Sequence, residues 1–206
     1  IRDKLVTGVQ TCALPISQPV TDAPWRPASV ASGGSPYAWF GPANGIRMAE
    51  IVATDLKRLA PDAAARIEAN RAAFAAELQA IRAEYETKLL SVSDPHLYAL
   101  TDRFVYLTNE FGIEVEGYFL EDDVRWTPDD FAGFSGFLKE RGIKHVLHHW
   151  QPADPIAAAV AAAGAELLVL DDGENTIAPA AGKPDPRGYQ KLLRADLDAL
   201  YGALSR

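Results

Sequence analysis

Two pairs of adjacent side chains carry the chemistry best suited to holding a ligand: His148 with His149, and Asp171 with Asp172. Imidazole nitrogens and carboxylate oxygens are ligands that zinc and manganese accept in proteins. Both pairs also suit a purely structural role, because Asp-Asp-Gly favours a turn on its own and two histidines beside Trp150 can form ordinary hydrogen bonds. The residues alone therefore predict a candidate site and leave its occupant open.

Four short apolar segments alternate with helical ones, and this alternation predicts a parallel sheet covered by helices. We expect strands at 97–100, 115–120, 143–148 and 167–170, and helices at 103–111, 128–140, 155–163 and 188–204. Ligands of such sheets bind at the carboxyl ends of the strands. Thr101, His149 and Asp171 each follow a predicted strand, so we expect them at one crevice. One histidine of the pair should be directed into it.

Capping residues predict where two helices begin or end. Thr127 and Pro128 mark the start of the 128–140 helix, and Gly142 marks its end. Asp62 is the predicted N-cap of a longer helix, in which apolar residues recur at positions 67, 74, 78, 81, 85 and 89. About 28 residues at 1.5 Å each make a rod of roughly 40 Å. Periodicity alone leaves open whether this rod joins two lobes or lies on the surface of a bundle; another helix is predicted at 42–59.

Composition excludes several classes of protein. The formal net charge of −8, from 28 acidic and 20 basic residues, argues against nucleic acid or an anionic membrane as partner. No apolar run of the sequence approaches the roughly 20 residues that span a bilayer. The only cysteine, Cys12, leaves no disulfide framework and no paired-cysteine metal site. The sequence has no phosphate-binding glycine loop, GxSxG elbow or HExxH helix. A soluble, acidic α/β protein is expected.

The first residues require a separate interpretation. Residues 6–16 (VTGVQTCALPI) have no helical or strand period and look like a sequencing adapter translated in frame. We interpret residues 1–16 as an artefact of this kind and exclude them from fold reasoning. The natural beginning of the protein, with any signal peptide and most of a first lobe, is then expected to be missing from this sequence.

Two segments resemble motif blocks of a known family. Residues 35–39 (SPYAW) and 101–106 (TDRFVY), in this order around the two helices, are similar to blocks of the metal-binding receptors of bacterial zinc and manganese ABC importers, the ZnuA/TroA-like family. There the blocks usually read Asn-Pro-His-x-Trp and His-Asp-Ala-Phe-x-Tyr, and both histidines hold the metal. Tyr37 and Thr101 stand at those positions here. Residues 188–197 resemble the closing segment, Tyr-x-x-x-Met-x-x-Asn-Leu, so the resemblance runs from about Ser35 to Leu204.

The resemblance implies a domain organisation and a site. Residues 17–60 would be the remnant of an N-terminal lobe, 61–92 a long linker helix and 93–206 the C-terminal α/β lobe. Asp171 matches a ligand position of the family, and His149 lies near a position where many relatives carry a glutamate. We therefore expect Asp171 and His149 as metal ligands, with Tyr37 and Thr101 lining the cleft as poorer donors.

The implied function is capture of zinc or manganese between two lobes, followed by delivery to a membrane permease. The protein would be a periplasmic or membrane-tethered monomer and not an enzyme, with the metal as transported ligand and no other cofactor. A first alternative is a module of the same fold that has lost metal and binds an organic solute or a protein. A second is a hydrolase that pairs His148 or His149 with Asp171 or Asp172 and uses Thr101 as nucleophile.

Overall fold

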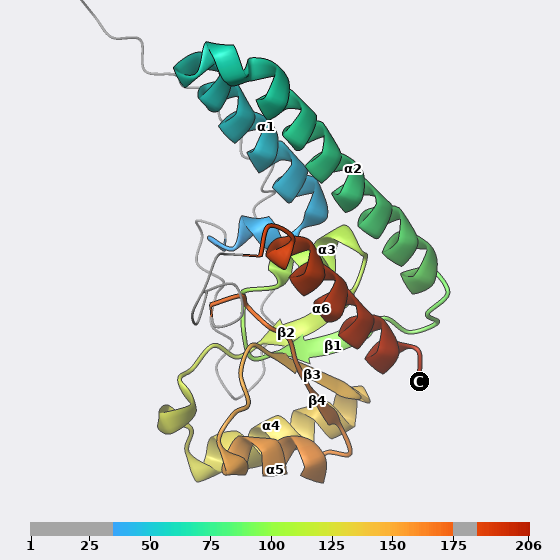
Figure 1. The fold of residues 1–206 in the computed structure, drawn as a ribbon. Coiled ribbons are helices and arrows are strands. Elements are labelled where there is room, and N and C mark those ends of the chain that lie inside the picture. Colours follow the sequence, from blue (N-terminus) through green and yellow to red (C-terminus); the bar gives the residue numbers. More distant parts are fainter. Residues whose placement is uncertain (1–34, 175–184) are drawn as a thin grey trace, which may run out of the picture.

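The computed structural model describes residues 35–174 and 185–206 as a mixed α/β chain (Figure 1). Its elements are η1 (Ala38–Phe40), α1 (Pro42–Leu59), η2 (Pro61–Ala63), α2 (Ala64–Leu89), β1 (His96–Ala99), α3 (Val105–Glu110), β2 (Glu114–Tyr118), η3 (Asp123–Arg125), α4 (Pro128–Arg141), β3 (His145–His148), α5 (Asp154–Ala162), β4 (Glu166–Val169) and α6 (Gly188–Leu204). The adapter interpretation of residues 1–16 and the segment 17–34 lie outside the described residues.

The four strands form one parallel sheet in the order β2-β1-β3-β4, which confirms the predicted fold class. Alternation along the strands gives the sheet two apolar faces. Leu97 and Leu147 join a core cluster with residues of α2, α3 and α6. Tyr98 and Val146 join a second cluster with residues of α4 and α5. The sheet is therefore covered by helices on both sides.

Helix α4 begins and ends where its capping residues predict. The Thr127 hydroxyl accepts the Asp130 N–H at 3.3 Å, and the Asp130 carboxylate accepts the Thr127 N–H at 2.8 Å. Gly142 ends the helix in the left-handed region, at φ 67°. Phe134 and Leu138 are fully buried against the sheet. This reciprocal capping fixes the start of α4 directly after the loop that follows β2.

The long predicted helix exists, but it starts later than expected. Pro61 begins a short 3-10 turn that contains Asp62, and α2 starts behind it with Ala63 as a cap that makes no side-chain hydrogen bond. Asp62 is thus not the N-cap. The 26 residues of α2 span roughly 39 Å. Figure 1 shows α1 and α2 side by side as a hairpin that extends away from the sheet.

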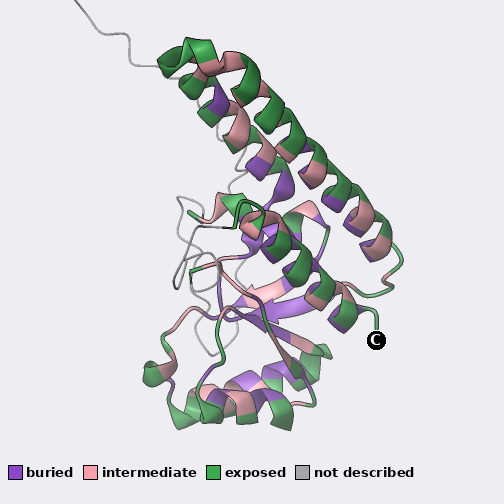
Figure 2. Cartoon of the chain, viewed as in Figure 1, coloured by how far each residue is buried: buried purple, intermediate pink, exposed green. Residues whose placement is uncertain are grey.

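Helix α6 holds the near end of α2 against the sheet. The Tyr85 hydroxyl donates to Asp198 at 2.5 Å, and Arg194 forms an ion pair with Glu84 at 2.5 Å. Five leucines of α6 enter the core cluster, at positions 192, 193, 197, 200 and 204. Burial is concentrated at this junction and in the sheet, whereas the far end of the hairpin is mostly exposed (Figure 2).

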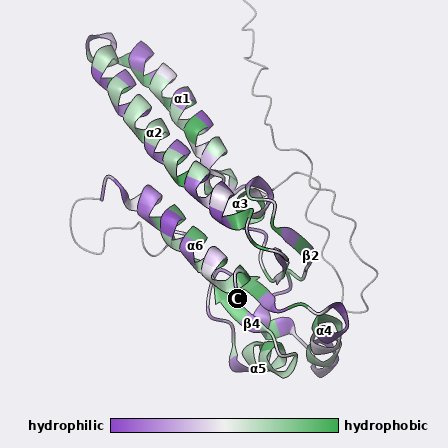
Figure 3. Cartoon of the chain, turned by 90° about the vertical axis from the view of Figure 1, so that its right-hand side faces the viewer, coloured by the Kyte–Doolittle hydropathy of each residue, from purple (hydrophilic) through white to green (hydrophobic). Residues whose placement is uncertain are grey.

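Helix α1 exposes a row of apolar side chains. Met48, Ile51, Val52, Leu56 and Leu59 are each at least 43% exposed, and we call this set the α1 apolar face. Hydrophobic positions accordingly occur on α1 as well as on the sheet in Figure 3. Between α1 and α2 lies a cavity of about 340 Å³ with mostly apolar walls. Within the described ranges no helix combines the length and apolar character needed to cross a membrane.

Candidate functional site

A cavity of about 200 Å³ opens at the carboxyl ends of the first three strands. We call it the strand-end cavity. Its walls come from the loops after β1, β2 and β3 and from the segment before η1, and they consist of Tyr37, Leu100, Thr101, Asp102, Arg103, Leu120, Glu121, Asp122, Asp123, His148, His149 and Trp150. This is the place at which open parallel α/β sheets commonly bind ligands.

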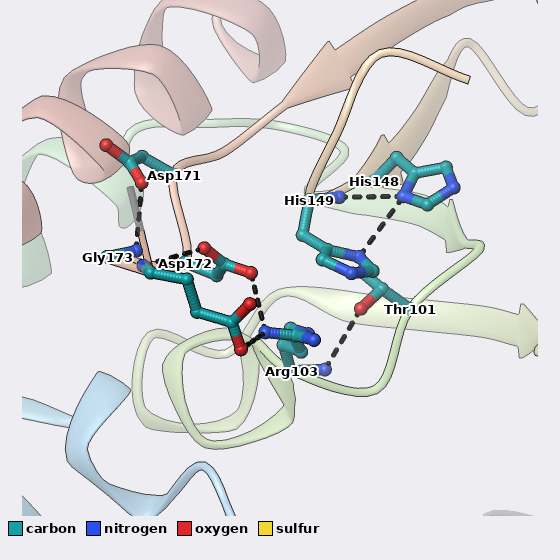
Figure 4. A network of polar contacts seen from close by, with 8 residues as sticks. Thr101, Arg103, His148, His149, Asp171, Asp172 and Gly173 are labelled. Atoms are coloured by element: carbon teal, nitrogen blue, oxygen red, sulfur yellow. Dashed lines mark hydrogen bonds and ion pairs between the residues drawn. The ribbon is translucent and has the colours of Figure 1, made fainter. Parts of the chain in front are cut away.

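Three of the four predicted site residues share this cavity. Tyr37, Thr101 and His149 line it, although they come from separate parts of the chain. Asp171, from the loop after β4, is not among its lining residues. Its Oδ1 accepts the Gly173 N–H at 2.8 Å, and in Figure 4 the carboxylate is directed away from the His149 ring. Of the three residues expected at one crevice, Thr101 and His149 line the cavity, while Asp171 lies to one side.

The two histidines set each other's protonation. The backbone N–H of His149 donates to Nδ1 of His148 at 2.8 Å, so that nitrogen carries no proton. Nδ1 of His149 lies 3.2 Å from the same atom and can form a hydrogen bond there only as the donor. Neutral His149 is thus protonated on Nδ1, which leaves a lone pair on Nε2. That Nε2 atom is buried and has no hydrogen-bond partner among the described residues.

Residues of the β2 loop and of β3 position His148. Its Nε2 faces Oδ1 of Asp123 at 3.7 Å, while Oδ2 of Asp123 accepts the Trp150 indole N–H at 3.2 Å and the Ala153 N–H at 3.3 Å. His148 is almost fully buried, at 2% exposure. The imidazole that orients His149 is therefore itself held in place, as the partners of a metal-binding histidine usually are.

Burial keeps both histidines neutral. It lowers the pKa of His149 to about 3, and the positive charge of Arg103 acts in the same direction. Burial also lowers the pKa of His148, although the Asp123 carboxylate opposes the shift. Neutral imidazole is the form that binds a metal ion. His149 can therefore offer its Nε2 lone pair throughout the physiological pH range.

Arg103 is a residue of this site that the sequence analysis did not single out. Its Nη1 contacts Oδ2 of Asp172 and Oε1 of Glu174, both at 2.6 Å, and its Cζ lies 4.7 Å from the centre of the Tyr37 ring. Figure 4 shows Arg103 close to both the Asp172 carboxylate and the His149 ring. A signal for it existed in the TDRF segment, since an arginine stands where the resembling family carries alanine.

The loop after β4 rests on a buried carboxyl group. Oδ1 of Asp196 on α6 accepts the Asp171 N–H at 2.9 Å, while Oδ2 is buried without a hydrogen-bond partner among the described residues. Burial raises the pKa of Asp196 to about 7, and the Asp171 and Asp172 carboxylates add to this shift against the opposing Asp171 N–H. The proposed ligand Asp171 is thereby fixed through its backbone to α6.

No preassembled metal centre is present in the part of the chain that the structure describes. There, no three or more His, Cys, Asp or Glu residues are grouped so that they could hold an ion. His148 faces Asp123 rather than Asp171 or Asp172, and the Thr101 hydroxyl accepts the Arg103 N–H at 3.3 Å. The residues that line the strand-end cavity thus include one imidazole with a buried Nε2 that lacks a partner among the described residues, several carboxylates and one arginine.

Parallel α/β domains with a polar cavity at the strand ends form a class that commonly binds ligands there. The chain belongs to the family described as "ZnuA: Zinc-uptake complex component A periplasmic", whose sequence model matches residues 9–203. The resemblance drawn from the motif blocks is confirmed. This is a family of periplasmic metal-binding proteins and not of enzymes, which excludes the hydrolase alternative.

Solved structures agree with this assignment. The laminin-binding protein Lbp of Streptococcus pyogenes is 26% identical, with a TM-score of 0.65 over 82% of this chain and 64% of that one. The Zn(II)-bound ZnuA-like domain of Streptococcus pneumoniae AdcA is 22% identical, with a TM-score of 0.68 over 83% and 64%. FpvC from Pseudomonas aeruginosa in complex with Mn²⁺ is 21% identical, with a TM-score of 0.67 over 82% and 63%.

The last two likenesses show the fold alone. The chain spans less than two thirds of the length of these solved proteins. A search of curated protein sequences returned no significant match.

Proposed function

We propose that this chain is the substrate-binding component of a bacterial ABC importer, which captures zinc or manganese outside the cytoplasmic membrane and delivers it to a membrane permease. Membership of a family described as a periplasmic zinc-uptake component supports this proposal, which adds the importer role and the choice of metal. The observation that carries it is the buried Nε2 lone pair of His149 at the strand-end cavity. Relatives of the same fold are solved with Zn(II) and with Mn²⁺.

The proposed ligands are His149 and Asp171, with Tyr37 and Thr101 shaping the cleft. His149 is already oriented by His148 and neutral. Asp171 lies in the loop after β4 and must turn its carboxylate away from the Gly173 N–H before it can reach a metal in the cavity. Metal binding by Asp171 is therefore expected to break its hydrogen bond with the Gly173 N–H. Neutral hydroxyl groups at Tyr37 and Thr101 are weak donors and contribute shape and hydrogen bonds.

We also propose the two-lobe organisation: residues 17–60 as part of a first lobe, 61–92 as the linker helix and 93–206 as the C-terminal lobe. Two observations support it. Helix α2 is long and extends past the sheet. The α1 apolar face exposes several large apolar side chains on one helix, which is typical of a surface that another part of a protein covers. In this arrangement the strand-end cavity is one half of a cleft, and the protein acts as a monomer.

The test is isothermal calorimetry with zinc and with manganese on the metal-free chain and on His149→Ala and Asp171→Ala. Each substitution is expected to lower the affinity by more than about tenfold, because even an outer-shell partner is worth 10–100-fold. His96→Ala is the matched control. It removes an imidazole at the opposite end of β1, where His96 pairs with Asp94, and should leave the affinity unchanged.

Loss of binding in both site variants, with normal binding in His96→Ala, would support a metal site at these strand ends. Equal affinity in all four proteins would contradict the proposed ligands. If neither ion binds the unchanged chain, the metal proposal for this chain fails.

One observation favours a second function, in which a module of the same fold binds an organic solute or a protein. The positions that carry histidines in the resembling family hold Tyr37 and Thr101, and Trp150 at 45% exposure adds an aromatic wall to the cavity. This function predicts that no divalent ion raises the melting temperature, while a solute that fills the cavity does. A rise in melting temperature with zinc or manganese alone would contradict it.

A further inference from the structure

The backbone around Arg103 is firmly anchored, so its side chain has a defined place in the strand-end cavity. The next residue, Phe104, is buried at 1% exposure and packs edge-on against Phe40, with ring centres 4.8 Å apart. The Arg103 N–H donates to the Thr101 hydroxyl. The guanidinium therefore projects from a rigid turn directly after β1 and not from a loose loop.

The guanidinium is held by carboxylates on one side and by an aromatic ring on the other. Two carboxylate oxygens, from Asp172 and Glu174, lie 2.6 Å from a single nitrogen, Nη1. The Asp172 side chain is only 7% exposed, so it has little access to solvent while this pair is intact. The Tyr37 ring lies against the guanidinium and closes the other side. Together these contacts join three separate segments of the chain around one fixed positive charge.

In this cavity the positive charge of Arg103 is better placed to repel a divalent cation than to bind an anion. Glu121, Asp122 and Asp123 line the same cavity, and a free anion would meet all three carboxylates. A divalent cation would be attracted by them, but close to His149 it would meet the Arg103 charge, which already disfavours a proton on that imidazole. Like charges at short distance in a partly buried site repel strongly.

We propose that Arg103 is a specificity-determining residue that acts as an internal cation: its guanidinium holds the Asp172 and Glu174 carboxylates and must leave them before a divalent metal ion can bind beside His149. This inference rests on the proposed metal-receptor function. The arginine makes the site selective, because only an ion that binds the released carboxylates well enough can displace it. It also accounts for the lack of a preassembled metal centre among the described residues.

The experiment compares zinc and manganese affinities of the metal-free chain with those of Arg103→Gln and Arg103→Met. Both variants remove the charge, and we expect both to raise the affinity at least about tenfold. Arg103→Lys keeps a charge and should bind within about threefold of the unchanged chain. Arg125→Gln is the matched control, because Arg125 pairs with Glu121 and Asp122 on the wall of the same cavity without being one of its lining residues. It should raise the affinity less than about threefold.

The double variant Arg103→Gln/Asp172→Asn tests whether the released Asp172 carboxylate binds the metal. The rise in metal affinity expected for Arg103→Gln should disappear in this double variant. An affinity of Arg103→Gln and Arg103→Met equal to or below that of the unchanged chain overturns the inference, whereas metal binding by the unchanged chain would still support the proposed function. Binding only after removal of the arginine supports the inference and contradicts metal capture by the unchanged chain. Binding by none of these proteins overturns both.

A measurement on the unchanged chain avoids any folding defect of the variants. The side-chain NMR signals of the Arg103 guanidinium should shift during a zinc titration as the ion pair with Asp172 opens. Signals that stay unchanged at saturating zinc would overturn the inference.

Discussion

A single hydrogen-bond acceptor, Nδ1 of His148, decides what His149 can do. Because that atom takes both the His149 N–H and the His149 ring proton, the second imidazole is left with its lone pair at the cavity. The same pair without burial would exchange protons with solvent and lose this orientation. The chemistry of the site therefore depends on the packing beneath it as much as on the two side chains.

Asp196 offers a test of the packing under the β4 loop. Its folded-state pKa of about 7 lies above the roughly 3.9 of an unfolded chain, so the folded state binds an extra proton between these values. Stability should then be highest at low pH within this window and fall as the pH rises to about 7. Asn at this position, which the resembling family carries, cannot ionise. We expect the stability of Asp196→Asn relative to the unchanged chain to rise by about 2–3 kcal/mol from pH 5 to pH 8.

Urea unfolding in metal-free buffer at several pH values measures this difference. Asp62→Asn, which changes an exposed aspartate in η2, is the control and should follow the unchanged chain. A stability difference for Asp196→Asn that stays constant from pH 5 to pH 8 would contradict the buried, protonated carboxyl.

The sequence predicts the place of a site residue only where that residue directly follows a strand. Thr101 and His149 meet because parallel strands end at one edge of the sheet, and that rule is visible in the pattern. Tyr37 reaches the same cavity from the segment before η1, which the strand rule does not predict. The ion pair of Arg103 with Asp172 joins residues 69 positions apart, and the Asp171 carboxylate is turned by its hydrogen bond with the Gly173 N–H. Such contacts leave no periodic signal, so the choice of Asp171 as a ligand remains a prediction.

At the level of elements, Gly45 of α1 lies in close contact with side chains of α2 and α6. A Cβ atom there would lie 2.5 Å from the Tyr189 hydroxyl oxygen and 3.1 Å from Cδ1 of Leu78. The Tyr189 hydroxyl donates to the Trp39 carbonyl, and its ring stacks on Phe74. Position 45 therefore requires a glycine because a side chain would collide with Tyr189 and Leu78, and not because the backbone adopts an unusual conformation.

Gly45→Ala should destabilise the protein by about 1–3 kcal/mol, because the added methyl group displaces Tyr189 from Trp39. Gly136→Ala is the matched control in an exposed part of α4, where a Cβ would meet nothing within 4 Å. It should stabilise the protein by about 0.5–1 kcal/mol through helix propensity. Thermal unfolding of both variants measures whether each substitution lowers or raises the stability. Equal changes in stability for the two variants would contradict the crowding at Gly45.

Most elements were predictable because local signals and tertiary packing agree. All four strands and the helices between them lie within a few residues of their predicted positions, and α6 and α1 have the predicted bounds. The start of α2 was wrong because Pro61 favours a 3-10 turn, which places Asp62 inside the turn rather than before the helix. The packing of α6 along α2 had no local signal, since it depends on pairs such as Tyr85 with Asp198.

For the whole molecule, the α1 apolar face is the feature that the described residues leave uncovered. Exposed side chains of this size, gathered on one helix, mark a surface that binds another part of a protein. The proposed first lobe fits this requirement.

The double variant Val52→Gln/Leu56→Gln should bind less of an environment-sensitive apolar dye than the unchanged chain, because it interrupts the middle of that face. Dye fluorescence at equal protein concentration measures this, with circular dichroism to verify folding. Val124→Gln is the control, since Val124 is 92% exposed but lies apart from the face, on η3. Unchanged dye fluorescence in the double variant would show that the face is not an accessible apolar surface.

The position of α6 also makes one side of the sheet depend on a segment that follows all four strands in the sequence. Its leucines complete the core cluster on that side and pack beside residues of α2. Contacts between α6, α2 and the strands therefore join residues far apart in the chain, and such non-local contacts slow folding. We expect the last step of folding to be the docking of α6 onto the sheet.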